Sequence, residues 1–128
     1  MLIAAQLVAG LAAVLHVVFF VFESLLWTRP AVYARFGIAS REQAETIRPM
    51  AYNQGFYNLA LAVGVFVGIV MLGREGSAGL VGKTLVVFGL ACMVVAGVVL
   101  ATTGRRYWTA AAIQFVPAAL ALALTVAA

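Results

Sequence analysis

Charged residues are scarce in this chain, and aspartate is absent altogether. Of its 128 residues, 9% are Asp, Glu, Lys or Arg and 66% are hydrophobic, whereas charged residues make up about 25% of a typical soluble protein. A chain this short leaves much of its surface exposed when it folds. So few charges cannot cover that surface in water, so the composition argues strongly against a soluble enzyme and predicts a single membrane domain.

Cysteine and histidine occur once each, as Cys92 and His16. One cysteine excludes a disulfide scaffold, and one histidine with one cysteine excludes a zinc module. Cys92 lies inside an apolar run, where it is typical of a small packing residue. The chain also lacks a glycine-rich phosphate loop, a Ser-His-Asp set and a pair of haem-type histidines. We therefore expect no metal site and no cofactor.

Four long apolar runs occupy most of the sequence. Each holds about 20 residues or more, enough to cross a hydrocarbon core of about 30 Å at 1.5 Å per residue. Backbone groups within lipid must be paired inside the segment, which favours helices. The sequence therefore predicts an all-α, polytopic membrane protein whose residues 1–128 form one antiparallel four-helix bundle. The expected transmembrane helices cover residues 2–27, 50–72, 84–103 and 107–127, each bound being approximate.

The first connection is longer than the other two and carries helix signals of its own. Pro30 ends the first helix, and Ser40 with Gln43 forms a capping box for a short helix. We expect residues 30–48 to form an interfacial segment at head-group level. Pro49 then restarts the chain near the beginning of the second span.

Basic residues are distributed unevenly between the two ends of the predicted bundle. The end with the first and third connections holds six, namely Arg29, Arg35, Arg41, Arg48, Arg105 and Arg106, against Arg74 and Lys83 at the other end. The positive-inside rule places the first end in the cytoplasm of a bacterial inner membrane, with both termini outside. The basic residues are separated by apolar runs, so we expect membrane lipids rather than nucleic acid as partners.

The predicted spans contain two ionisable residues, His16 and Glu23. Ionisable residues inside a membrane are functional-site hypotheses. Seven residues apart, the two differ by about 700°, so they share a helix face but lie about 10 Å apart along the axis. That separation rules out a direct hydrogen bond and a shared metal ion. Two structural alternatives remain open: His16 hydrogen-bonds a neighbouring helix, or Glu23 snorkels or pairs with an arginine of the first connection.

Further polar residues fall in the same leaflet as Glu23, with His16 deeper. The second span opens with three amides and two tyrosines, and the fourth span holds an amide before Pro117. Amides that only pack helices are one explanation, but their segregation to one leaflet favours a polar cavity open toward the cytoplasm. The predicted ligand-binding residues are His16, Glu23, Trp27, Asn53, Gln54, Tyr57, Asn58 and Gln114.

The tract Asn53-Gln54-Gly55-Phe56-Tyr57-Asn58 is the most specific motif in the chain. With Glu23 and Trp27 before it and Gln114-Phe115-Val116-Pro117-Ala118 after it, the chain resembles a family of small bacterial and fungal integral membrane proteins. That family is catalogued only as a domain of unknown function, number thirteen-oh-four. The resemblance implies a four-helix membrane protein and no established reaction. The signature positions it suggests are Glu23, Trp27, Phe36, Asn53, Gln54, Gly55, Tyr57, Asn58, Gln114 and Pro117.

Three classes of function remain open on this sequence. The favoured one is binding, and possible transport, of a small polar or amphipathic molecule in the polar pocket. The second is an intramembrane acid–base enzyme acting on a lipid-soluble substrate, for which Glu23 and His16 are the candidate catalytic residues. The third is a structural or assembly subunit whose amides only pack helices. A homo-oligomer is compatible with all three classes.

Overall fold

The computed structural model describes all 128 residues, and its regular structure is entirely helical. In chain order it contains α1 (Leu2–Phe20) with a π-helical turn (Val21–Leu25), α2 (Pro30–Tyr33), a 3-10 turn (Ala34–Phe36), α3 (Arg41–Met71), α4 (Gly76–Thr102), a 3-10 turn (Arg105–Tyr107) and α5 (Trp108–Ala127). Four helices are long and apolar enough to cross a membrane. This confirms the predicted all-α fold class and is the architecture of a multi-pass membrane protein.

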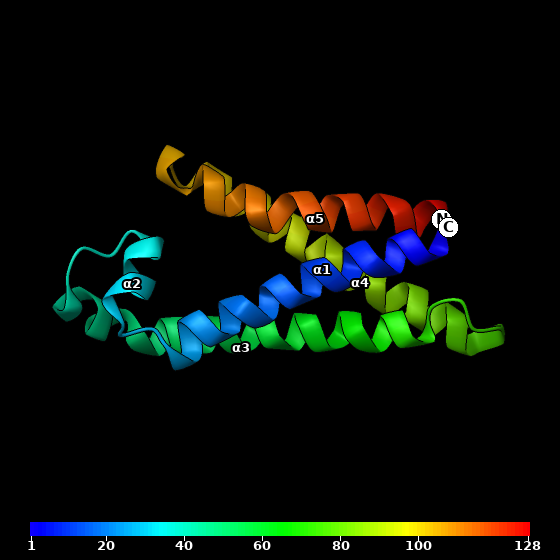
Figure 1. Cartoon of the computed structure of the whole chain (residues 1–128), viewed down its shortest axis with the longest axis horizontal. Coiled ribbons are helices and arrows are strands. Elements are labelled where there is room, and N and C mark those ends of the chain that lie inside the picture. The colour runs from blue at the N-terminus through cyan, green and yellow to red at the C-terminus, as the bar shows by residue number, and fades with distance from the viewer.

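The helices pack as two antiparallel pairs that cross each other. Helix α1 packs on α3 and α4 on α5, and the pairs meet through α1 with α5 and α3 with α4. Figure 1 shows both termini and the α3–α4 connection at one end, with α2 and the α4–α5 connection at the other. Small residues dominate the core, including Ala9, Ala12, Ala13, Ala62, Ala118 and Ala121. Small side chains let helix backbones approach closely, which is how helices associate in lipid.

Glycines allow close contact between α3 and α4. A methyl group at Gly68 would lie 2.8 Å from Val86 Cγ2 and 2.9 Å from the carbonyl oxygen of Gly82. Gly64, one turn earlier, has no atom within 4 Å of the same position. Gly64 and Gly68 form a GxxxG pattern, which is typical of close helix contacts in membranes. Only Gly68 of the two faces another helix of the chain.

We expect Gly68→Leu to destabilise the bundle and Gly64→Leu to be tolerated. Leucine at Gly68 must push α4 away, and overpacking of this kind costs typically about 1–3 kcal/mol. Thermal unfolding of the two purified variants measures the difference. Equal melting temperatures for both would contradict the close contact at Gly68. Loss of a dimer in Gly64→Leu alone would show that Gly64 faces a second copy.

The short helix expected after Ser40 is instead the first part of α3, whereas the earlier part of the expected interfacial segment forms α2 and a 3-10 turn. Helix α3 runs without interruption through Pro49. Its start is stabilised by the expected capping box, in which Ser40 Oγ accepts from Gln43 N at 3.2 Å and Gln43 Oε1 accepts from Ala39 N at 3.3 Å. Proline removes one internal hydrogen bond, and the surrounding turns hold the helix together. At about 45 Å, this helix of 31 residues exceeds the hydrocarbon thickness, so its first turns extend beyond it.

Helix α4 also begins earlier than expected, at Gly76 rather than near Thr84. The glycines in this stretch predict a flexible turn because each costs about 1 kcal/mol in a helix. The structure uses one of them for packing, since a methyl group at Gly82 would lie 2.7 Å from Leu72 N. This close approach to the end of α3 offsets the poor helix propensity.

Candidate functional site

Glu23 lies at the centre of the π-helical turn that ends α1. The turn is closed by Leu26 N, which donates to the carbonyl oxygen of Val21 at 2.9 Å, five residues back. Single π turns inside α-helices are rare and occur frequently at functional sites. They change the direction of the side chains that follow, so the face of Glu23 is set by this turn rather than by ideal α-helical spacing.

The Glu23 carboxyl pairs with Asn58 of α3. Asn58 Nδ2 donates to Glu23 Oε2 at 2.6 Å. Asn58 is buried, with 5% of its surface exposed, whereas Glu23 is half-buried. The arginine-paired alternative for Glu23 is not what the structure shows, because the chain's ion pairs join Arg41 and Arg48 to Glu45.

Two oxygen atoms of this pair have no partner within the chain. Glu23 Oε1 and Asn58 Oδ1 make no hydrogen bond, whereas every fully buried polar side-chain atom has one. Neither oxygen is therefore completely enclosed by the chain. A carboxylate oxygen and an amide oxygen are acceptors only, so the pair presents two acceptors to a hydrogen-bond donor.

His16 forms a second, separate pair with Gln114 of α5. Its Nδ1 lies 2.9 Å from the carbonyl oxygen of Ala12, and its Nε2 lies 3.5 Å from Gln114 Nε2. Because a carbonyl only accepts, Nδ1 carries the proton and Nε2 accepts from Gln114. His16 is buried and stacks edge-on against Phe19. The imidazole thus joins α1 to α5, as the structural alternative predicts.

Gly55 allows the π turn to lie directly on α3. A methyl group at Gly55 would overlap Ser24 Oγ and lie 3.1 Å from Ser24 N. Ser24 Oγ in turn donates to the carbonyl oxygen of Tyr52 at 2.9 Å. This contact is one helical turn from Asn58, so it sets the distance at which Glu23 and Asn58 meet.

Trp27 anchors the first connection to α3. Its Nε1, the only polar side-chain atom, donates to the carbonyl oxygen of Ala44 at 2.8 Å. Its ring packs against Phe36 with centroids 5.1 Å apart, and the residue is buried. These contacts fasten the residues after α1 to the start of α3, and a ligand contact at Trp27 stays a prediction.

The remaining predicted residues of the amide tract are exposed and do not join the Glu23 carboxyl. Asn53, Gln54 and Tyr57 all lie on the surface of α3. Asn53 precedes Asn58 by five residues and therefore points about 140° away from it. A tract longer than one turn cannot present all its side chains to one neighbour, so only Asn58 of this tract hydrogen-bonds Glu23. Ligand binding by the exposed residues of the tract stays a prediction.

Gln54 lies on the face of α3 that contacts α4 further along. It precedes Val65 by 11 residues and Gly68 by 14, which returns it to nearly the same direction. Val65 packs against Gly89 of α4, and Gly68 against Gly82. At Gln54 the same face is uncovered, and Figure 1 shows α4 and α5 diverging from α1 and α3 toward the end that carries α2. Gln54 is therefore exposed on the face that α4 covers further along α3.

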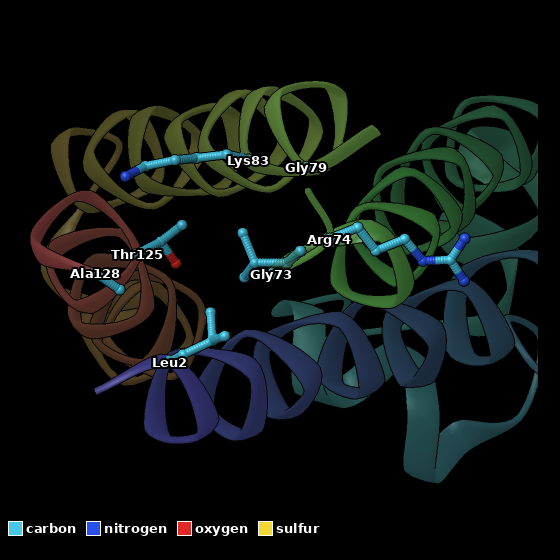
Figure 2. A pocket seen from close by; sticks show the side chains of 8 residues that line it. Leu2, Gly73, Arg74, Gly79, Lys83, Thr125 and Ala128 are labelled. Atoms are coloured by element: carbon cyan, nitrogen blue, oxygen red, sulfur yellow. The ribbon is translucent and has the colours of Figure 1, made fainter. Parts of the chain in front are cut away.

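Two cavities were resolved away from the Glu23–Asn58 pair. One, of about 180 Å³, lies at the end with both termini between Leu2, Gly73, Lys83 and Thr125, and Figure 2 shows the Arg74 side chain extending away from it. The other, of about 480 Å³, is an apolar groove between α4 and α5. No predicted ligand-binding residue lines either one. The Glu23–Asn58 pair thus lies outside both cavities.

The comparisons with known proteins give one match. The family described as "Protein of unknown function (DUF1304)" matches residues 10–126, which include every residue of the two hydrogen-bonded pairs. A search of the curated proteins and of the solved structures gives no match.

Proposed function

The chain belongs to this DUF1304 family, and we propose that it binds a small amphipathic molecule whose amine or hydroxyl head group is held by Glu23 and Asn58. The observation that carries the proposal is the pair of acceptor oxygens without a partner in the chain, Glu23 Oε1 and Asn58 Oδ1. One belongs to the π turn that ends α1 and the other to α3, and the hydrogen bond from Asn58 Nδ2 to Glu23 Oε2 holds the two side chains together.

A donor head group suits this site on electrostatic grounds. A charged side chain inside a membrane span costs about 2.5–3.5 kcal/mol on insertion scales. One hydrogen bond from Asn58 offsets only part of that cost. A primary amine carries a positive charge and several donors, so it neutralises Glu23 and satisfies both free oxygens. A hydroxyl group donates to one of them.

An apolar tail suits the surroundings of the site. Phe20 packs edge-on against Phe56 with ring centroids 5.1 Å apart, and Tyr52 packs against Phe56 at 5.0 Å. These aromatic side chains belong to the last residue of α1 before the π turn and to the part of α3 that contacts this turn. A molecule with its head group at Glu23 would keep its tail among them and in the adjoining lipid.

The other two classes of function receive less support. Acid–base catalysis by Glu23 and His16 together receives less support, because both nitrogens of His16 are used in hydrogen bonds to Ala12 and Gln114, which leaves Glu23 as the only free base. A role in packing alone explains the bond from Asn58 to Glu23 but leaves two acceptor oxygens of the same pair without partners. Ligand binding accounts for both features.

The site is proposed to face the cytoplasm. The six basic residues at the α2 end and the two at the other end favour this orientation. We expect a cysteine placed at exposed Ser77, in a Cys92→Ala background, to react with an impermeant maleimide from outside the cell. Labelling of that cysteine only after the membrane is opened would invert the orientation.

Ligand binding is tested with the intact protein in nanodiscs. We expect dodecylamine to raise the melting temperature in a saturable way, since a ligand of the folded state stabilises by RT ln(1 + [L]/Kd). Dodecanoate, with the same tail and an anionic head, is expected to give no saturable shift. Equal shifts with the two compounds would show that only the tail matters and would overturn the proposed role of Glu23.

A further inference from the structure

An apolar groove runs between α4 and α5 near their connection. It has a volume of about 480 Å³ and is lined on one side by Gly97, Val98 and Ala101 and on the other by Trp108, Ala112 and Phe115. At its floor the helices touch, because a methyl group at Gly97 would lie 2.9 Å from Phe115 Cβ. Both helices are membrane-spanning candidates, so this groove is open to lipid.

Aromatic and basic side chains define the end of the groove at the α4–α5 connection. Trp108 Nε1 donates to the carbonyl oxygen of Ala101 at 3.2 Å, which fixes the indole at this end. The Arg105 guanidinium lies over the Trp108 ring, 5.5 Å from its centroid, and Arg106 is the next residue. Neither arginine has a carboxylate partner in the chain. Tryptophan and arginine are typical of the membrane–water interface.

We propose that this groove binds an anionic phospholipid, with one acyl chain between α4 and α5 and the phosphate at Arg105. The apolar lining matches the chain, and the unpaired positive charge matches the head group. Basic pockets between transmembrane helices bind anionic lipid head groups in this way. Because the groove shares no residue with the Glu23–Asn58 pair, this inference stands independently of the proposed function.

The test measures lipid retention by native mass spectrometry after release from nanodiscs of equal phosphatidylglycerol and phosphatidylcholine content. We expect phosphatidylglycerol to be retained over phosphatidylcholine about fivefold, since one basic residue near the surface contributes about 1 kcal/mol. Arg105→Gln is expected to abolish the preference. Ala112→Phe, which fills the groove, is expected to reduce retention of both lipids.

Two matched controls locate the effect. Arg74→Gln removes a positive charge at the opposite end, and Ala123→Phe adds a phenyl ring to an exposed part of α5 outside the groove. Both are expected to retain phosphatidylglycerol as the unmodified chain does. Equal retention of the two lipids, or the same loss in Arg74→Gln, would overturn the proposal. So would a dimer that dissociates in Ala112→Phe, because the occupant would then be a second copy.

Discussion

Replacing Glu23 with glutamine is expected to weaken amine binding about 10- to 100-fold and to leave the bundle folded. Glutamine keeps an oxygen that accepts from Asn58 Nδ2, so the contact between α1 and α3 survives. Its amide nitrogen takes the place of the carboxyl oxygen that has no partner. This nitrogen is a hydrogen-bond donor, so it cannot accept from the amine head group. Loss of a charged hydrogen bond costs about 1.5–3 kcal/mol, which corresponds to that range of affinity.

Glu42→Gln is the matched control for this variant. Glu42 lies at the exposed start of α3, so the substitution removes the same charge from the same end of the chain. We expect unchanged dodecylamine affinity for Glu42→Gln in nanodisc titrations. A Glu23→Gln protein with full dodecylamine affinity would reduce the carboxyl to a packing role. Equal weakening in both variants would assign the effect to net charge rather than to the site.

The four-helix architecture was predictable because hydrophobic length alone sets it. Runs of about 20 apolar residues in lipid permit little other than helices. Helix ends were less predictable, since they depend on contacts between distant residues. Pro49 and the glycines before Thr84 are typical of breaks, yet α3 and α4 continue through them. At Gly82 the close packing against Leu72 compensates for the low helix propensity of glycine.

The sequence predicts which types of residue form the site, an acid and an amide, but not which amide hydrogen-bonds the acid. An acid inside a span needs a donor, and Asn58 was among the four candidate amides. Which amide it finds depends on the π turn at Val21–Leu25. The turn redirects Glu23, and helical spacing along α1 cannot supply that direction. The one indication in the sequence is Gly55. It lies among the amides and, having no side chain, allows another helix to approach α3 closely.

The largest structural effect in the chain is expected for Gly55→Leu. Any side chain here meets Ser24 Oγ and the backbone nitrogen of Ser24. The π turn must then move away from α3, which lengthens the bond between Asn58 and Glu23. Overpacking costs typically about 1–3 kcal/mol and occasionally more, and a lost hydrogen bond to a charged group adds about 1.5–3 kcal/mol. We expect a large fall in melting temperature together with loss of dodecylamine binding.

A smaller substitution distinguishes the steric clash with Ser24 from a general destabilisation of the bundle. Gly55→Ala adds one methyl group, and Ser24→Gly removes the atoms that it meets most closely. We expect the loss of stability in the double variant to be smaller than the sum of the losses in the two single variants, because substitutions of residues in contact are not additive. Gly10→Leu, at a glycine with no atom within 4 Å, is expected to change stability little. Additive effects of Gly55→Ala and Ser24→Gly would mean that this contact does not hold the π turn against α3.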